Sequence, residues 1–409
     1  MTPRVVVTDA EERAALGAAR GLAAAGYSVT AIGCHRAAAT HWSRSCAERV
    51  VLPDPRDDAE LFADELATLL ARNDYAALIP ASDASLLAIS AHRDRLDGLV
   101  RLGLPSAAAV SRSVDKRLLG SVAAAVGLPP PPSRACDDET SAAAAAAELG
   151  YPVVLKPSRS FVRNGNGLRQ LPVSRVESAR ELASALERYE PPFVVQQYVR
   201  AGFLSCTGVV AEPGLLALTV SRVFRLWPVE AGMHAYSETI EAPPGLAERV
   251  FALLEEIGWR GIFQLQMLDR GDGRLAVIDL NPRLFASVAL DVRAGANLAA
   301  VWCDWLLRRR AAPVVAKPGV RYRWEEGELC HLLWQLRRGR VRAAASVLLP
   351  RRRVVHAWFR LRDPGPLFAR ALSLLLRGRG LGHGRAAARA PIVQPRVPPG
   401  SGRRATASR

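Results

Sequence analysis

Two short segments in the middle of the chain carry polar side chains at alternate positions, which is the spacing of one face of a β-strand. The first segment contains Gln264 and Gln266, and the second contains Asp279 and Asn281. The dipeptide Asp272-Gly273 between them favours a two-residue hairpin turn. That turn would set Gln266 opposite Asp279 and Gln264 opposite Asn281, with the paired side chains about 5 Å apart on one face.

Amide and carboxylate oxygens at this spacing can hold one or two hard cations. The alternative is a solvent-facing hairpin with ordinary polar alternation, although such a face in so arginine-rich a chain would be expected to carry charge. We therefore predict that Gln266, Asp279 and Asn281 are metal ligands. Arg283 follows the second strand and offers a planar guanidinium for phosphate or carboxylate. The residues predicted to point the other way, into a core, are Phe263, Leu265, Met267, Ile278 and Leu280.

The segment from Asp279 to Arg283, with Gln266 on the preceding strand, resembles the metal-binding hairpin of the ATP-grasp superfamily. Its combination of Gln, acid and Asn is most similar to the large subunit of carbamoyl phosphate synthetase. From about residue 4 to about residue 310 the chain looks closer to the single-copy carboxylate-amine ligases of the superfamily. The resemblance implies an ATP-grasp fold of two α+β lobes, with ATP and Mg²⁺ as cofactors and Mn²⁺ as an alternative ion.

Lysine occurs at only three positions, 116, 156 and 317, among the 55 basic residues. Lys156 ends an apolar strand, and the following loop contains Gly165 and Gly167, whose backbone amides are suited to phosphate. The resemblance implies that Lys156 contacts nucleotide phosphate and that Lys116 begins the ATP-binding region. For Lys116 the alternative is a plain role at the start of a helix capped by Ser113 or Asp115.

The apolar strand before residue 200 resembles the hinge on which adenine rests, which implies contacts from the backbone of Gln197, Tyr198 and Val199. The sequence departs from the family at two positions. Gln197 stands where many relatives carry an acid, and Asp279 replaces the usual Glu. These departures keep open an ATP-binding protein without ligase turnover.

Arg222 and Arg225 lie between the hinge and the metal hairpin, in a stretch that resembles the family's arginine-containing strand over the active site. With Arg283 they are predicted to clamp a carboxylate and its acyl phosphate, because guanidinium groups pair such oxygens bidentately. The alternative is a solvated strand edge. His234 is expected to be a turn or packing residue.

Five regions are predicted along the chain. Residues 1–112 alternate strands and helices and indicate a parallel, Rossmann-like α/β domain, without the GxGxxG turn of dinucleotide-binding proteins. Residues 113–199 would form the smaller ATP-grasp lobe, and residues 200–310 the larger lobe with the hairpin. Residues 311–383 would be a basic helical region, and residues 384–409 a disordered tail.

The charge is concentrated in the last hundred residues. The chain of 409 residues has a net charge of +16, and residues 308–409 hold 24 basic and 4 acidic residues. Residues 351–360 and 366–377 combine apolar and cationic side chains at helical spacing, which suits an anionic membrane surface or a nucleic acid backbone. A packing helix with a solvated basic edge is the alternative, and nucleic acid is disfavoured because no recognition module accompanies the patch.

The first residues already form a strand pattern, and no apolar run approaches the roughly 20 residues that span a bilayer. The expected location is the cytoplasm, with the basic region allowing a peripheral position at the membrane. The six scattered cysteines predict neither a disulfide framework nor a zinc site, since Cys34, His35, His41 and Cys46 fit no common zinc spacing.

The sequence thus predicts an ATP-dependent ligase that activates a small-molecule carboxylate as an acyl phosphate. It would join the carboxylate to an amine or another nucleophile and release ADP and phosphate. Two alternatives remain: an ATP-binding protein of the same fold without turnover, and a membrane- or nucleic-acid-associated adaptor that works through the basic C-terminus.

Overall fold

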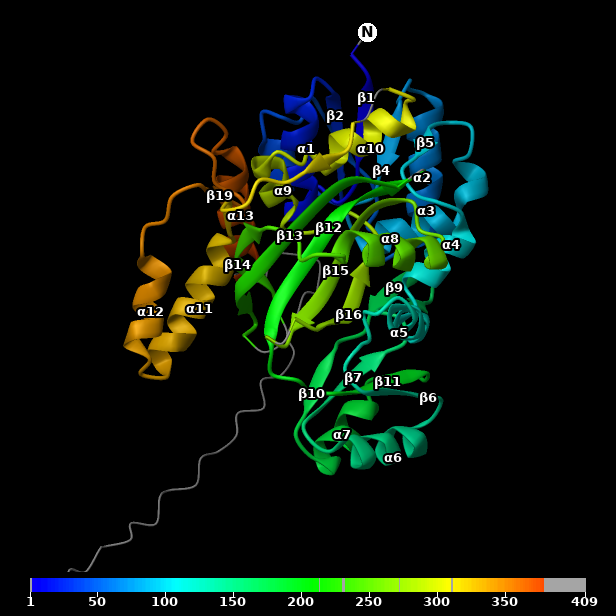
Figure 1. Cartoon of the computed structure of the whole chain (residues 1–409). Helices are drawn as coiled ribbons and strands as arrows, with labels where there is room; N and C mark the ends of the chain where they lie inside the picture. The colour runs from blue at the N-terminus through cyan, green and yellow to red at the C-terminus, as the bar shows by residue number, and fades with distance from the viewer. Residues whose placement is uncertain (1, 213, 230–231, 272, 310–311, 379–409) are drawn as a thin grey trace, which may run out of the picture.

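The computed structural model describes residues 2–212, 214–229, 232–271, 273–309 and 312–378. These residues form a parallel sheet domain, a small lobe, and a large lobe whose long sheet lies between the other two (Figure 1). The tail predicted at residues 384–409 lies outside the described residues.

The N-terminal domain is a five-stranded parallel sheet with helices packed on it, as predicted. Apolar strands such as Val5–Val7 are fully buried, because helices cover both faces of such a sheet. The strand order is β3-β2-β1-β4-β5. Its elements are β1 (Arg4–Val7), α1 (Arg13–Ala24), β2 (Ser28–Gly33), η1 (Ala39–Trp42), β3 (Glu48–Val51), α2 (Ala59–Ala71), β4 (Ala77–Ile79), α3 (Asp83–Ala91), η2 (Arg93–Arg95) and β5 (Arg101–Leu102).

Two helices, α4 (Ala107–Ser113) and α5 (Lys116–Ala125), lead into the small lobe. This lobe has a four-stranded sheet in the order β10-β7-β11-β6, a two-stranded β8-β9 hairpin, and its own core around Phe193. Its elements are β6 (Ser133–Cys136), α6 (Glu139–Leu149), β7 (Val153–Pro157), β8 (Phe161–Asn164), β9 (Gly167–Gln170), β10 (Ser174–Val176), α7 (Ala179–Leu186) and β11 (Phe193–Gln197).

The large lobe is built on an eight-stranded sheet whose path runs β16-β15-β12-β13-β14-β18-β19, with β17 paired to β13. The helices α1, α9 and α10 supply core residues against one face of this sheet. The lobe comprises β12 (Gly202–Ala211), β13 (Gly214–Trp227), β14 (Met233–Ile240), α8 (Leu246–Ile257), β15 (Gly261–Asp269), β16 (Leu275–Asn281), α9 (Val288–Ala294) and α10 (Leu298–Leu306).

The C-terminal region belongs to the same sheet, contrary to the prediction of a separate helical region. Its strands β18 and β19 extend the sheet beyond β14, so the predicted helix at residues 351–360 is wrong, whereas the helix predicted at 366–377 is confirmed. A buried ion pair between Arg20 and Asp363, at 2.9 Å, ties this region to the N-terminal domain. The elements are β17 (Val314–Val315), β18 (Arg321–Arg323), α11 (Glu325–Arg337), α12 (Val341–Leu348), β19 (Val354–His356) and α13 (Gly365–Gly378).

The hairpin of β15 and β16 has the predicted register at its far end and a different one near its turn. Gln264 pairs with Asn281 and Gln266 with Asp279, but Asp269 pairs with Leu275, one residue away from the predicted partner. A β-bulge after Gln266 absorbs the difference. The extra residue is Ile278, which is only partly buried. Val277 is buried and takes the core position that was predicted for Ile278.

Across the described parts of the chain, no helix combines the length and the apolarity that a bilayer crossing would require.

Candidate active site

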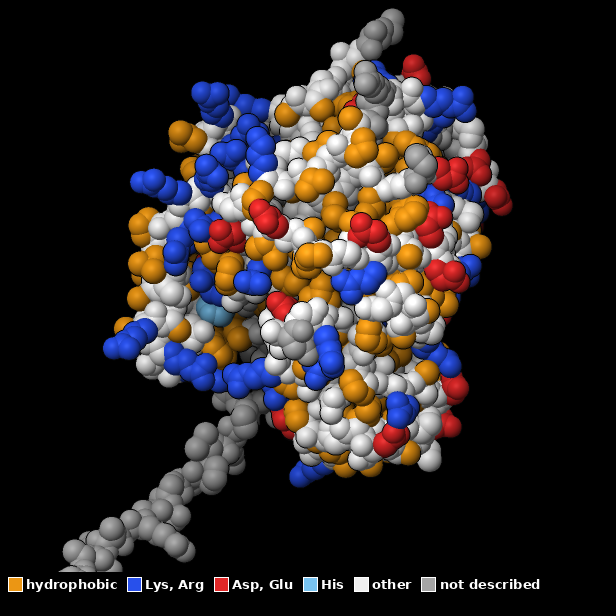
Figure 2. Space-filling model, in the orientation of Figure 1, with side chains coloured by type: hydrophobic (Ala, Val, Ile, Leu, Met, Phe, Trp, Pro, Cys, Tyr) orange, Lys and Arg blue, Asp and Glu red, His pale blue; other side chains and the backbone are white. Residues whose placement is uncertain are grey.

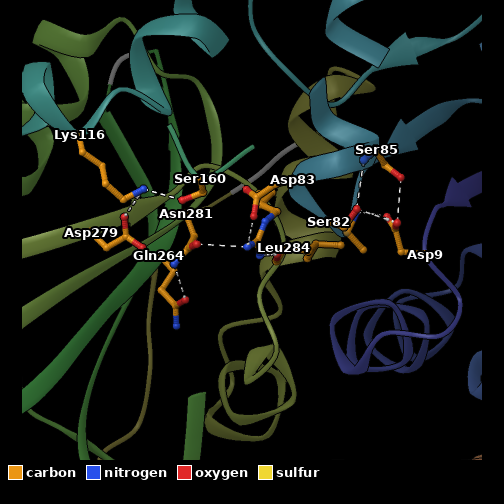
Figure 3. A network of polar contacts seen from close by, with 12 residues as sticks. Asp9, Ser82, Asp83, Ser85, Lys116, Ser160, Gln264, Asp279, Asn281 and Leu284 are labelled. Atoms are coloured by element: carbon orange, nitrogen blue, oxygen red, sulfur yellow. Dashed lines mark hydrogen bonds and ion pairs between the residues drawn. The ribbon is translucent and has the colours of Figure 1, made fainter. Parts of the chain in front are cut away.

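The polar face of the β15-β16 hairpin forms the floor of the site (Figure 3). Asn281 Nδ2 donates to Gln264 Oε1 at 3.1 Å, and Gln264 Nε2 donates to Ser205 Oγ on the neighbouring strand at 3.1 Å. These bonds fix the two amides, because each donor has a defined acceptor. Gln266 lies opposite Asp279 in the ladder, so both predicted ligands belong to the same face.

Lys116 reaches this face from the first position of α5. The helix begins there because the side chain of Asp115 accepts hydrogen bonds from the backbone amides of Arg117 and Leu118. Lys116 Nζ donates to Ser160 Oγ at 2.6 Å and lies 3.5 Å from Asp279 Oδ1. Lys116 therefore starts a helix and also presents its ammonium group to the metal hairpin.

Lys156, the last lysine before the glycine-containing loop, is buried beside the same carboxylate. Its Nζ donates to the backbone oxygen of Ile278, the bulged residue, at 2.9 Å. The pKa of Lys156 is lowered to about 8, chiefly because the side chain is buried; Asp279 opposes this shift, and the nearby Lys116 adds a smaller lowering. The bulge thus has a consequence for the site, because it supplies the carbonyl that holds this lysine.

Arg283 connects the end of the hairpin to the N-terminal domain. Its Nη2 lies 2.7 Å from Asp83 Oδ2 and 3.2 Å from Asn281 Oδ1, and its Nη1 donates to the Leu284 carbonyl at 2.8 Å. Burial favours loss of the proton, but Asp83 outweighs it and raises the pKa of Arg283. Arg283 Nε is buried and has no hydrogen-bond partner among the described residues.

Asp83 was missed by the sequence analysis. It occupies the first turn of α3, whose N-cap Ser82 follows β4. Ser82 and Ser85 donate to Asp9 Oδ1 at 2.7 and 2.9 Å, and burial raises the pKa of Asp9. Both acids lie just beyond the carboxyl ends of parallel strands, where ligands of α/β sheets bind, and this position was the available signal.

A small cleft of about 50 Å³, partly open to solvent, lies between these elements. Asp83, Lys116 and Asp279 line it, together with residues 159–161 at the start of β8. The predicted glycines lie further out along the same loop. Gly165 has a φ of +59° next to the hairpin tip, and the Cα of Gly167 packs against the backbone of Arg56, which leaves no space for a side chain.

The predicted adenine hinge lies at the end of β11. The amides of Gln197 and Tyr198 donate to the carbonyls of Pro132 and Pro152, at 2.8 and 3.2 Å. These two amides are therefore engaged within the small lobe. Val199, one residue beyond, is the remaining predicted position whose backbone amide could meet an adenine ring.

Arg222 and Arg225 are not brought to the cleft, contrary to the prediction. Arg222 pairs across the ladder with Leu204, which in turn faces Met267, so it lies on the face opposite Gln266. Arg225 makes two bonds of 2.6 Å to the buried carboxylate of Glu328. The alternating pattern of the strand did not reveal which face each arginine occupies.

A second group of metal-ligating side chains lies in the N-terminal domain. Ligand atoms of Glu11, Cys34 and His35 all lie within 4.8 Å of one another. The Cys34 amide donates to Glu11 Oε1 at 2.6 Å, and burial raises the pKa of Glu11 to about 7. Of the four residues whose spacing fits no common zinc pattern, Cys34 and His35 lie in this group together with Glu11, and His41 and Cys46 do not belong to it.

The donor set of the hairpin suits a cation that arrives with a polyanion. Asp279 is a single carboxylate that faces two lysines. A divalent ion without its polyanion would therefore meet net positive charge here. The Asn281 oxygen accepts from Arg283 but retains a second lone pair. Mg²⁺ is commonly held by one or two carboxylates together with substrate phosphates, so the residues fit that ion when nucleotide accompanies it.

No family model and no curated protein matches the sequence. Solved structures do match the fold. The N5-carboxyaminoimidazole synthetase from Staphylococcus aureus is 12% identical with a TM-score of 0.58, covering 78% of this chain and 82% of that chain. The L-amino acid ligase from Bacillus licheniformis is 15% identical with a TM-score of 0.55, covering 75% and 74%.

A third similar structure is the biotin carboxylase domain of the 2-oxoglutarate carboxylase from Hydrogenobacter thermophilus, in complex with MgADP, ADP and bicarbonate. It is 17% identical with a TM-score of 0.58 and covers 78% of this chain and 73% of that chain. At such identities the similarity establishes the fold and nothing finer. The chain therefore has the ATP-grasp fold, preceded by a parallel N-terminal domain, as the sequence predicted.

Proposed function

We propose that the protein is an ATP- and Mg²⁺-dependent ligase that activates a carboxylate as an acyl phosphate and transfers it to an amine or another nucleophile. The observation that carries the proposal is the meeting of Lys116, Lys156 and Asp279 on the polar face of the hairpin, beneath the segment before β8. Two lysines around one carboxylate leave a net positive site, which is the electrostatic requirement for a triphosphate.

The lysines would neutralise the transferring phosphate group. Lys156 is buried, so its ammonium interacts with a phosphate oxygen through little water and more strongly than an exposed lysine would. Lys116 can turn from Ser160 toward phosphate because an ammonium on a flexible stem is not bound to one geometry. Phosphoryl transfer depends mainly on such positioning and charge stabilisation, so no nucleophilic side chain is required.

Gln266, Asp279 and Asn281 are the residues that would hold Mg²⁺, which when bound supplies charge neutralisation between the β- and γ-phosphates. Arg283 would face the acyl phosphate. Its unpartnered Nε is a donor inside the site, and its pairing with Asp83 keeps the guanidinium in place and charged. The adenine would rest beside Val199. These roles are supported by residue type and position.

The substrates are proposed to be a small carboxylate and an amine, since the fold is shared with an L-amino acid ligase and with the biotin carboxylase domain of a 2-oxoglutarate carboxylase. The test is a screen of carboxylate and amine pools with ATP and Mg²⁺, scored by ADP release and by product mass. The proposal predicts ADP release that requires one carboxylate and one amine together, with a product whose mass equals their sum less water.

A second candidate is an ATP-binding protein without turnover. It is favoured by the single carboxylate on the hairpin, because Asp279 is short and is engaged by Lys116. Binding of MgATP without ADP release in any pool would support this candidate. Failure to bind MgATP at all would contradict both.

A further inference from the structure

Helix α11 buries polar side chains and exposes apolar ones, which is the reverse of an ordinary surface helix. The side chains that pack against the large-lobe sheet are polar: Glu328 binds Arg225 and Arg323, and the ring of His331 lies 3.4 Å from the Leu226 carbonyl. Glu328 and His331 are buried. A helix in water normally buries its apolar face, so the opposite arrangement needs a reason.

The outward face of α11 is a stripe of leucines. Leu329, Leu333 and Leu336 follow one another at the four- and three-residue spacing that keeps side chains on one side of a helix, and they are 56%, 45% and 48% exposed. The next helix, α12, adds Val341 and Leu348, which are also exposed. Contiguous exposed apolar side chains mark an interaction surface more often than plain surface.

The segment that contains the leucine stripe and the residues after it are rich in arginine. Nine arginines and no acidic residue occur between residues 329 and 362. Arg338 and Arg340 lie where α11 passes into α12, and their guanidinium groups lie 4.2 and 5.6 Å from the Trp334 ring centroid. Figure 2 shows apolar and basic side chains intermixed along the flank where Figure 1 places α11 and α12.

We propose that the α11-α12 hairpin docks on the surface of an anionic phospholipid bilayer, with the leucine stripe among the acyl chains and the arginines at the phosphates. An exposed apolar helix face bordered by arginine, with an aromatic ring at the boundary, is the arrangement that binds such an interface. A second copy of the chain is a poorer occupant, because it would bring two arginine-rich surfaces together.

The direct test is flotation of the full-length protein with vesicles. Wild-type protein is expected to float with phosphatidylcholine vesicles that contain phosphatidylglycerol and to stay in solution with pure phosphatidylcholine. Added salt should weaken the binding, since the attraction between arginine and headgroup is screened. Equal binding to both vesicles, or to neither, would overturn the proposal.

Two sets of variants separate the apolar and the charged contributions. The triple variant L329S/L333S/L336S should lose at least about ten-fold in partitioning, because three leucine side chains no longer move from water into the acyl-chain region. Arg338→Gln with Arg340→Gln should lose about five-fold per arginine. The matched controls are Leu61→Ser on α2, whose leucine is 47% exposed, and Arg72→Gln, which should float like wild type.

Light scattering on the same proteins tests whether the leucine stripe binds a second copy of the chain instead of lipid. The proposal predicts the same molar mass for wild type and for the triple variant, with unchanged thermal melting because these side chains are already in water. A wild-type dimer that the triple variant converts to monomer would assign the leucine stripe to a second copy and refute lipid docking. Loss of flotation in the Leu61→Ser control would equally refute a specific role for α11.

Discussion

The lysine and arginine side chains on the two faces of the large-lobe sheet have different surroundings. On the face of Gln266, Lys116 and Lys156 share one carboxylate, Asp279, and Lys116 and Asp279 border a cleft. On the opposite face, Arg225 binds the buried carboxylate of Glu328, and Arg323 lies 3.6 Å from the same carboxylate. Arg222 lies 3.7 Å from Asp269. Arg225 is bound through two of its nitrogens to both oxygens of Glu328, whereas neither lysine of the first face has such a two-point contact with Asp279.

This difference separates residues that await a ligand from residues that hold the fold together. A buried cation without its own carboxylate is costly unless an anion binds there, whereas a paired cation already has its partner. Residue type alone does not make the distinction, because the sequence placed Arg222 and Arg225 in the active site on their guanidinium chemistry. Five variants or conditions test the comparison.

The largest effect is expected from Asp279→Asn. Removing the charge that holds the cation should lower substrate-dependent ADP release about 1000-fold, the loss typical of an electrostatic group in a phosphoryl-transfer site. The matched control is Asp269→Asn, because Asp269 lies on the same hairpin with similar side-chain exposure, 24% against 29%. Similar losses in both variants would show that the hairpin is merely structural.

Arg225→Gln should harm stability and spare catalysis. It leaves the buried carboxylate of Glu328 without its closest partner, which should cost about 3 kcal/mol in the free energy of unfolding. Adding Glu328→Gln should restore most of the loss, and ADP release below the melting temperature should stay near the wild-type rate. A slow but fully stable Arg225→Gln enzyme would contradict the division between the two faces.

Lys156→Gln should weaken MgATP binding about 30-fold, since a charge-assisted hydrogen bond to phosphate contributes about 2 kcal/mol. Lys317→Gln, at an exposed lysine outside the cleft, is the control and should bind like wild type. Isothermal titration calorimetry measures both. Equal affinities for the two variants would remove Lys156 from the nucleotide site.

Nucleotide affinity should also fall with rising pH. The pKa of Lys156 is about 8 in the free protein and must be higher beside bound phosphate, so binding takes up a proton above that pH. Affinity is therefore expected to be flat below about pH 8 and to fall by up to about ten-fold per pH unit above it. Lys156→Arg should lack this dependence, because arginine does not titrate in this range. The same slope in that variant would point to another group.

The smallest effect is expected from Arg222→Gln. Its side chain is half exposed and its partner Asp269 is 3.7 Å away, so both stability and ADP release should stay within about two-fold of wild type. A large loss of ADP release would return Arg222 to the active site and would mean that the sheet face differs during turnover.

The fold and the floor of the site were predictable because they rest on local pattern. The alternation of Gln264 and Gln266 with apolar residues determines which face each strand buries, and a bulge at Ile278 restores the pairing that the turn alone would have shifted. Asp83 was not predictable in the same way, because its contact with Arg283 joins residues 200 positions apart. The strand Val354–His356 was missed because three residues are too few to show the alternation of apolar and polar side chains that marks a strand, and its pairing with β18 is not visible in the sequence.

The central claim is that the hairpin oxygens hold the cation that accompanies the nucleotide. A crystal structure with Mn²⁺ and ADP, using the anomalous signal of manganese, tests it most directly. A manganese peak is expected bonded to the carboxylate of Asp279 and the amide oxygen of Asn281, with phosphate within reach of Lys156. A peak at Glu11, Cys34 and His35, or on the phosphates with Asp279 still paired only to Lys116, would contradict it.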